Sequence, residues 1–235
     1  MNKRNVLFVS IDALKPELVY NQEKYGISLP TINKLIKEGS YVRDGVKSVF
    51  PSFTYCCHQS MITGTYPAKH GIEGNKYFDP MGIHNDAWFW YTSDKVQNLW
   101  EQSKNNGYLS VNIGWPTSVM AEADYSIPEY WRDTTTLDSE ILSAISIPKG
   151  LSKEVEEGIG RNIPCGKWGI EDDVIKLETC LWILENKIKP NLLEKPFFMT
   201  TYFASYDDCA HNEGVYGNTA LEYLVKTDEL LGLLI

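Results

Sequence analysis

The sequence has few basic residues and only four histidines for its 235 residues. Lys and Arg total 22 against 31 Asp and Glu, which gives a net charge of −9 at pH 7. This balance argues against binding to nucleic acid duplexes, because contact with their phosphate backbones requires basic patches. A small phosphorylated substrate remains compatible with it, since bound metal ions can supply local positive charge.

Long apolar runs and a regular cysteine pattern are also missing. The five cysteines are an odd number and include the adjacent Cys56 and Cys57, a usage typical of a reducing compartment and not of a disulfide framework. The first apolar run follows Arg4 and is too short and interrupted for a signal peptide or a membrane span. We therefore expect a cytoplasmic protein without a membrane partner.

The order of apolar segments predicts the fold class. With 43% apolar residues, no internal repeat and no clear linker, the chain can form one domain or most of one. Segments with strand and helix patterns alternate, which predicts an α/β fold with a mainly parallel sheet flanked by helices. The predicted strands are residues 5–11, 108–113 and 196–204, and the predicted helices are residues 30–39, 98–107, 170–188 and 218–235.

This alternation fails between about residues 114 and 165. The stretch is rich in aromatic and polar residues, and we expect an insertion or lid near the functional site, where substrate specificity often resides. Its aromatic residues could line a pocket for the leaving group or simply pin a long loop to the core.

The most informative stretch covers residues 50–75. Residues 41–50 read as an extended segment, Pro51 and Ser52 interrupt it, and Thr54 then stands at a predicted helix start. Free backbone N–H groups at a helix start can face an anion such as phosphate. By residue type alone an N-cap role for Thr54 is the simpler interpretation. Two distant parts of the chain reverse that preference.

These two parts place carboxylates and an imidazole after strands. Asp12 closes the first apolar strand, and Asp207 and His211 lie on what we expect to be a loop after the strand at 196–204. Ligands of α/β sheets bind at the carboxyl ends of the strands. Asp and His are metal-ligand types, so the three side chains are candidates for a metal site.

Together, three blocks resemble the type I phosphodiesterase and nucleotide pyrophosphatase branch of the alkaline phosphatase superfamily. They are a strand ending in Asp12, Thr54 with Asn75 following 21 residues later, and Tyr-Phe-x-x-x-Asp-x-x-x-His from Tyr202 to His211. The most specific part is the run Thr-Gly-x-Tyr-Pro-x-x-His-Gly-Ile-x-x-Asn, which ends at Asn75. The resemblance implies an alkaline phosphatase-like fold.

The resemblance also implies residue roles. Thr54 would be the catalytic nucleophile, forming a phospho-threonine intermediate, and would share one metal with Asp12. Asp207 and His211 would bind a second metal, and Asn75 would hold a phosphate oxygen during catalysis. Tyr202 would bind substrate by stacking on a nucleobase. The two divalent ions would be zinc, although manganese and iron accept the same mixed donors.

Each of these assignments has a structural alternative. Asp12 could be a surface carboxylate or a helix N-cap, Asn75 a plain turn residue, and Tyr202 a core residue. We expect His58 and His70 to support the loop by hydrogen bonding and not to bind metal.

The sequence departs from the family pattern near its end. The family completes its metal cluster with an Asp-His pair and a further His, whereas no His follows His211 here. We expect Asp228 to lie on the solvated face of the last helix. Since zinc sites take three or four protein ligands, residues 1–235 are expected to be the N-terminal part of a single domain, incomplete at the C-terminus, with doubtful metal occupancy.

The leading hypothesis is a metal-dependent hydrolase of phosphate diesters or nucleotide pyrophosphates acting on a small substrate such as a nucleotide. The alternatives are a phosphomonoesterase, a phosphonate or sulfate ester hydrolase on the same site, or a truncated domain without catalysis. The oligomeric state is open, although an unfinished sheet could leave an edge that promotes self-association.

Overall fold

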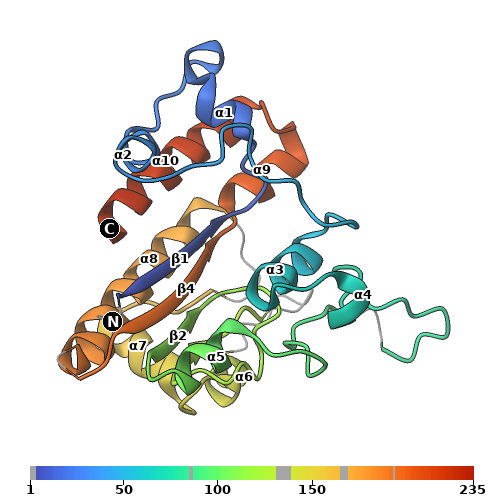
Figure 1. The fold of residues 1–235 in the computed structure, drawn as a ribbon, viewed down its shortest axis with the longest axis vertical. Helices are drawn as coiled ribbons and strands as arrows, with labels where there is room; N and C mark the ends of the chain where they lie inside the picture. The colour runs from blue at the N-terminus through green and yellow to red at the C-terminus, as the bar shows by residue number, and fades with distance from the viewer. Residues whose placement is uncertain (1–3, 85–86, 131–138, 165–168, 193) are drawn as a thin grey trace.

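A four-stranded parallel sheet forms the centre of the computed structural model, which describes residues 4–84, 87–130, 139–164, 169–192 and 194–235. The strand order is β1-β4-β2-β3, and every pair is parallel. This confirms the predicted α/β fold with a mainly parallel sheet. The strands are β1 (Val6–Ile11), β2 (Leu109–Ile113), β3 (Tyr125–Ile127) and β4 (Phe197–Phe203) (Figure 1).

Helices cover both faces of the sheet. Side chains of β4 alternate between the two faces: Met199 and Phe203 pack against one helical layer, whereas Phe198 and Tyr202 pack against the other. The first layer consists of α6 (Ser139–Ile145), α7 (Leu151–Ile159), α8 (Ile170–Ile183) and α10 (Asn218–Leu234). The second consists of α3 (Thr54–Thr63) and α5 (Leu99–Asn105).

The remaining helical segments lie around these layers (Figure 1). They are α1 (Pro16–Tyr20), α2 (Pro30–Glu38), α4 (Pro67–His70) and α9 (Ser205–Glu213), with short turns at Gln22–Tyr25, Leu184–Ile188 and Lys189–Asn191. The helix predicted for residues 170–188 is therefore α8 continued by a π-helical turn.

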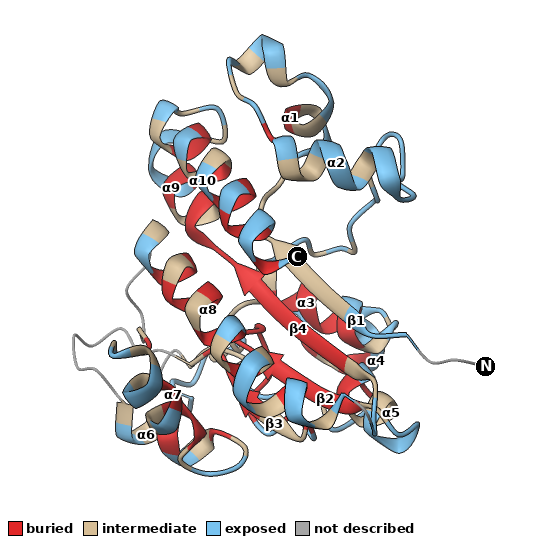
Figure 2. Cartoon of the chain, turned by 90° about the vertical axis from the view of Figure 1, so that its left-hand side faces the viewer, coloured by how far each residue is buried: buried red, intermediate tan, exposed pale blue. Residues whose placement is uncertain are grey.

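The strands differ in how deeply they are buried (Figure 2). Strands β2 and β4 are buried almost throughout, as expected for parallel strands covered on both faces. Strand β1 is only half-buried and, among the described residues, pairs with β4 alone, so it forms an edge of this sheet.

Two predicted segments differ from the structure. Residues 41–50 do not form a strand and lie in an irregular, largely exposed loop. Asp207 and His211 lie on helix α9 and not on a loop. The stretch at 114–165 contributes β3 to the sheet and α6 and α7 to the core, and its residues 131–138 and 165 lie outside the described residues. That this stretch is an insertion or lid stays a prediction.

The expectation for Asp228 was wrong. Its side chain is fully buried, and its two carboxylate oxygens accept hydrogen bonds from the backbone N–H groups of Thr31, at 2.9 Å, and Ile32, at 2.8 Å. These two donors belong to the first turn of α2, whose own N-cap, Leu29, has no side-chain acceptor. Asp228 therefore caps α2 from α10, a contact that periodicity within α10 does not reveal.

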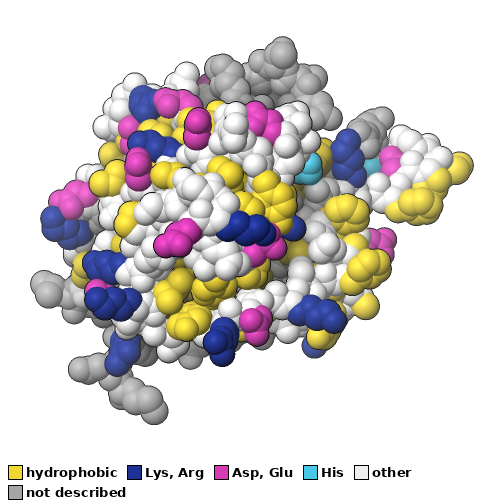
Figure 3. All heavy atoms as spheres, turned by 90° about the horizontal axis from the view of Figure 1, so that it is seen from above, with side chains coloured by type: hydrophobic (Ala, Val, Ile, Leu, Met, Phe, Trp, Pro, Cys, Tyr) yellow, Lys and Arg dark blue, Asp and Glu magenta, His cyan; other side chains and the backbone are white. Residues whose placement is uncertain are grey.

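Charges of both signs are interspersed on the face seen from above in Figure 3. The described residues on this face form no extended basic patch, which agrees with the low content of Lys and Arg in the sequence. Among the described helices, none combines the length and apolar character that a bilayer crossing requires.

Candidate phosphoryl-transfer site

The candidate site lies at the carboxyl ends of β1 and β4, where α3 and α9 begin (Figure 1). Asp12 follows β1 directly, and its backbone N–H donates to the carbonyl oxygen of Phe203, the last residue of β4, at 3.0 Å. The parallel register therefore brings the end of the first strand beside the start of α9, although the two are about 190 residues apart in the chain.

Thr54 is the first residue of α3, and its side chain does not cap that helix. The N-cap is Phe53, whose side chain makes no capping hydrogen bond. Instead, the Thr54 hydroxyl donates to Oδ2 of Asp12 at 3.2 Å. The N-cap alternative for Thr54 is therefore wrong, and the hydroxyl faces a carboxylate at the carboxyl end of the sheet.

Asn75 is fixed against the same helix start. Its Oδ1 accepts a hydrogen bond from the backbone N–H of Tyr55 at 3.0 Å. Asn75 thus connects its loop to the first turn of α3 and lies beside Thr54. This contact goes beyond the local hydrogen bonds of a plain turn residue.

Asp207 and His211 are one turn apart on α9. Nε2 of His211 lies 3.2 Å from Oδ2 of Asp207; the histidine side chain is 78% exposed and the aspartate 26%. Burial and then the nearby charge of Asp12 raise the pKa of Asp207 to about 6, despite the opposing effect of His211. Burial and the charge of Asp12 thus both favour the protonated form of the Asp207 carboxyl.

Tyr202 is a core residue whose hydroxyl reaches the site. It is 3% exposed, and its ring packs edge-on against His58 with centroids 4.8 Å apart. Its hydroxyl donates to Oδ2 of Asp12 at 2.7 Å and so helps to orient that carboxylate. This packing favours the core alternative over stacking of a nucleobase on the ring.

The two buried histidines support the loop and helix, as predicted. Nδ1 of His58 lies 2.7 Å from the carbonyl oxygen of Thr54, and its Nε2 lies 2.9 Å from the hydroxyl of Ser10. Burial lowers the pKa of His58, which favours the neutral ring. His70 similarly contacts the Ser60 hydroxyl at 2.9 Å.

Thr54, Asn75, Tyr202, Asp207 and His211 line one cavity of about 190 Å³. It is smaller than most sites that enclose a whole ligand, so it suits a phosphoryl group with the rest of the substrate reaching outward. Its described lining is Thr54, Tyr55, Asn75, Trp88, Glu129, Tyr202, Ala204, Asp207, Asp208 and His211. Asp12 is not part of the lining and contacts it through Thr54 and Tyr202.

Sequence reasoning missed several lining residues, Glu129 above all. Its side chain is buried, and burial raises the pKa of this carboxyl to about 7. Glu129 comes from the stretch at 114–165, where no periodicity marked it. The only signal was an acidic residue set among aromatic and apolar neighbours, as in Ile-Pro-Glu-Tyr.

The donor types fit divalent metal ions, but each candidate pair is small. Asp12 with Thr54 and Asp207 with His211 offer two donors each, and no group of three or more His, Cys, Asp or Glu able to hold a metal occurs among the described residues. Burial is the main cause of the raised pKa values of Asp207 and Glu129, and a cation bound nearby would stabilise the charged form of both carboxyls. These side chains would therefore hold part of each ion's coordination shell.

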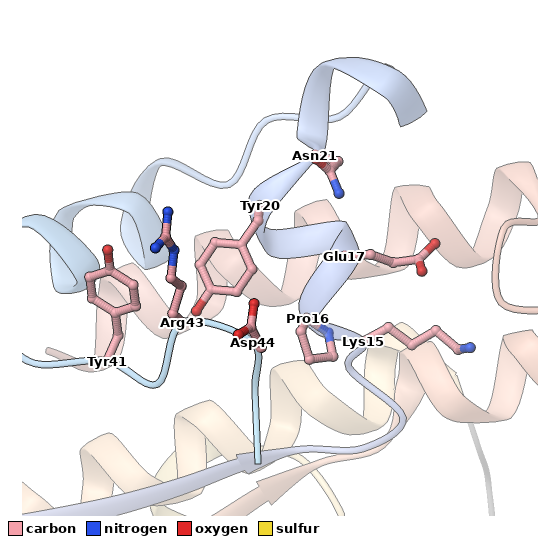
Figure 4. A pocket seen from close by; sticks show the side chains of 8 residues that line it. All are labelled: Lys15, Pro16, Glu17, Tyr20, Asn21, Tyr41, Arg43 and Asp44. Carbon is pink, nitrogen blue, oxygen red and sulfur yellow. The ribbon is translucent and has the colours of Figure 1, made fainter. Parts of the chain in front are cut away.

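A second hollow, of about 590 Å³, lies beside α1 and shares no residue with the cavity (Figure 4). Lys15 and Arg43 face it together with Glu17 and Asp44, so its charges balance. The Tyr20 hydroxyl donates to a backbone carbonyl at 3.0 Å. We assign this hollow no part in the chemistry.

Solved structures with a similar backbone define the class of fold. Murine ectonucleotide pyrophosphatase/phosphodiesterase 5 matches with a TM-score of 0.60 and 21% identity over 99% of this chain and 52% of that chain. Phosphonoacetate hydrolase from Sinorhizobium meliloti 1021, in complex with phosphonoformate, matches with a TM-score of 0.62 and 16% identity over 98% and 53% of the two chains. The fold is therefore alkaline phosphatase-like.

Sequence comparison then gives the family. Residues 6–235 match the family described as type I phosphodiesterase / nucleotide pyrophosphatase, and the chain belongs to that family, as the resemblance predicted. Human ectonucleotide pyrophosphatase/phosphodiesterase family member 1 is 25% identical over 97% of this chain and 21% of its own length. Human bis(5'-adenosyl)-triphosphatase is 26% identical over 98% of this chain and 42% of its own length. The chain thus spans less than half the length of these two relatives.

Proposed function

We propose that the protein is a metal-dependent hydrolase of phosphate diesters or nucleotide pyrophosphates with Thr54 as a covalent nucleophile. The observation that carries the proposal is the hydrogen bond from the Thr54 hydroxyl to Asp12, beside a cavity that Asn75, Asp207 and His211 also line. A hydroxyl is a weak nucleophile by itself, so a neighbouring carboxylate and bound cations are the activation that such chemistry needs.

In the proposed reaction, Oγ1 of Thr54 attacks phosphorus while the bond to the leaving oxygen breaks, and that oxygen departs with the bonding electron pair. Asp12, already accepting the hydroxyl hydrogen, takes up the proton. Water then attacks phosphorus and the bond from phosphorus to Oγ1 of Thr54 breaks. Asp12 returns its proton to Oγ1, and the proton lost by the water leaves with the phosphate product. The side-chain amide of Asn75 would hold a phosphate oxygen beside the N-terminus of α3.

The metal ions would be held by Asp12 with Thr54 and by Asp207 with His211, with further ligands outside these pairs. When bound, they would stabilise the negative charge that develops on the oxygens around phosphorus. Zinc is the proposed metal, and manganese or iron would suit the same donors.

A diester or pyrophosphate substrate is favoured by the aromatic part of the cavity. Tyr55 and Trp88 line it beside Thr54, with ring centroids 5.4 Å apart, and such rings suit an organic substituent on phosphorus. A nucleotide is the proposed substituent, because one relative is named bis(5'-adenosyl)-triphosphatase and one solved relative is an inactive form in complex with AMP. The proposed location is cytoplasmic, on the cysteine usage alone.

Paired hydrolysis assays test the proposal. With zinc added, the full-length protein should cleave bis-p-nitrophenyl phosphate faster than p-nitrophenyl phosphate, and Thr54→Ala should reduce cleavage to background. Thr65→Ala is the matched control, since the Thr65 hydroxyl bonds to that of Thr63 and Thr65 is not among the described residues that line the cavity. Full activity in Thr54→Ala would remove the covalent mechanism, and a preference for the monoester would overturn the substrate class.

A further inference from the structure

A buried group of charges on α8 lies directly behind the candidate site. Asp173 is fully buried, and Asp172 and Lys176 are each about 90% buried. Ion pairs are rarely buried this deeply without a structural role, because removing charges from water is costly. The contacts of these residues lead to both halves of the site.

Asp173 binds the junction between β4 and α9. Its Oδ1 accepts from the backbone N–H of Ala204 at 3.0 Å, and its Oδ2 accepts from the N–H of Ser205 at 3.2 Å and from the Ser205 hydroxyl. The N-cap residue of α9 is Ala204, whose side chain cannot accept a hydrogen bond. Asp173 therefore caps α9 from a different helix, and the capped residue Ser205 lies two residues before Asp207.

Lys176 joins the second half of the site. Its Nζ pairs with Oδ2 of Asp172 at 2.8 Å and lies 4.9 Å from the centre of the Tyr202 ring, whose hydroxyl orients Asp12. The end of β2 leaves room for its stem: a Cβ on Gly114 would lie 3.1 Å from Cε of Lys176. Both Tyr202 and the capped end of α9 thus rest on one turn of α8.

We propose that Asp173 and Lys176 are positioning residues: Asp173 fixes the start of α9, and Lys176 supplies the buried countercharge that supports this carboxylate and the Tyr202–Asp12 contact. Asp207 and His211 then keep a set distance from Thr54 and Asp12. The consequence for hydrolysis rests on the proposed function, whereas the capping itself does not.

Electrostatics agree with this arrangement. Burial raises the pKa of Asp173, although Lys176 and the bonds from Ser205 and Ala204 oppose that effect. Burial acts to lower the pKa of Lys176, but the carboxylates of Asp172, Asp173 and Glu129 outweigh it and raise the pKa. Each charge therefore depends on the other, and removing one leaves its partner buried without compensation.

The test uses Asp173→Ala, the isosteric Asp173→Asn and Lys176→Met, with Glu171→Gln as the matched control. Glu171 is an exposed carboxylate on the same helix that pairs with Arg161, so its loss leaves the contacts of Asp173 and Lys176 in place. Amide hydrogen exchange should speed up in residues 204–211 in Asp173→Ala, partly recover in Asp173→Asn, and stay unchanged in Glu171→Gln. Unchanged exchange in Asp173→Ala would overturn the capping role, whether or not the protein hydrolyses any phosphate ester.

The second readout concerns the site. In the zinc-loaded protein, kcat for bis-p-nitrophenyl phosphate should fall on the order of 10- to 100-fold in Asp173→Ala and in Lys176→Met, with KM nearly constant, because displacing a catalytic group by about 1 Å can cost that much. Asp173→Asn should recover part of kcat. Faster exchange at α9 with unchanged kcat would show a purely structural cap and reject the positioning role. Absent hydrolysis in the unmutated protein would instead reject the proposed function.

Discussion

Crowded carboxylates define the candidate site at the scale of single residues. Burial is the largest cause of the raised pKa of Asp207 and of Glu129, and the negative charge of Asp12 adds to both shifts. A protein region with this surplus of negative charge is poised to bind cations, and it carries a cost when no cation is bound.

Glu129 gives a prediction for stability against pH in metal-free protein. Its folded-state pKa is about 7 against an ordinary value of 4.5, so the folded state binds the proton more tightly. The stability from this group is complete below about pH 4.5 and is lost as the pH rises to about 7. Glu129→Gln should therefore be the more stable protein at pH 8, by up to about 3 kcal/mol, and should lose that advantage at pH 4.5.

Urea unfolding at several pH values, with EDTA present, measures the difference. Glu122→Gln is the control, because Glu122 lies in the same segment and is exposed. A stability difference between Glu129→Gln and the unmutated protein that does not change with pH would contradict the burial of an ionising carboxyl at this position.

His211 gives a prediction for metal binding. With two donors in each pair among the described residues, calorimetric titration of the 235-residue chain with zinc should show weak binding. His211→Ala should weaken it further, whereas His84→Ala, in an exposed loop outside the cavity, should leave it unchanged. Two tight sites on this chain would show that the ligands are wrongly assigned.

The main site residues could be predicted from sequence because each sits at a position with a local signature. Asp12 follows an apolar strand, and Thr54 follows a Pro-Ser interruption at a helix start. Glu129 and Lys176 could not, because their roles come from contacts between segments far apart in the chain. From a helical sequence pattern alone, a charged residue is predicted to be exposed to solvent. Only the packing of neighbouring elements shows that it is buried.

Capping between elements is the recurring device at the scale of helices. Asp228 of α10 caps α2, and Asp173 of α8 caps α9. In both cases the N-cap residue, Leu29 or Ala204, has no acceptor of its own. This is why α9 was predicted as a loop: the signal for its start lies about 30 residues upstream, on another helix.

Removal of the Asp228 cap should destabilise α2 and its packing on α10. Asp228→Ala should lower the free energy of unfolding by about 1–2 kcal/mol, the usual range for loss of a helix cap. Glu229→Ala is the control, since Glu229 is the next residue and its side chain forms an exposed ion pair with Lys226. Chemical denaturation compares the two variants, and equal losses would contradict the capping role of Asp228.

Sheet order is the feature of the whole molecule that sequence could not supply. The rhythm of strands and helices predicted a parallel sheet, but the place of β4 between β1 and β2 follows from packing of distant segments. The three-residue strand β3 was missed because it is too short for a periodic pattern and is defined by its pairing with β2.

The half-buried edge strand β1 predicts self-association of the 235-residue chain. An edge offers unpaired backbone groups to another copy, and a charged side chain on it discourages such pairing. In light scattering, the apparent molar mass of the unmutated chain should rise with protein concentration. Val6→Lys, on β1, should reduce this rise, and Val46→Lys, in an exposed loop, should not. A monomeric chain at every concentration, or equal effects of the two variants, would contradict this interpretation of the edge.

Trapping the covalent intermediate tests whether Thr54 is the nucleophile. Zinc-loaded protein mixed with a diester substrate is quenched in acid during turnover, digested, and analysed by mass spectrometry. We expect a phosphoryl adduct on the peptide that contains Thr54, located on Thr54 itself and absent from Thr54→Ala. An adduct on another residue, or steady turnover with no adduct at all, would contradict it.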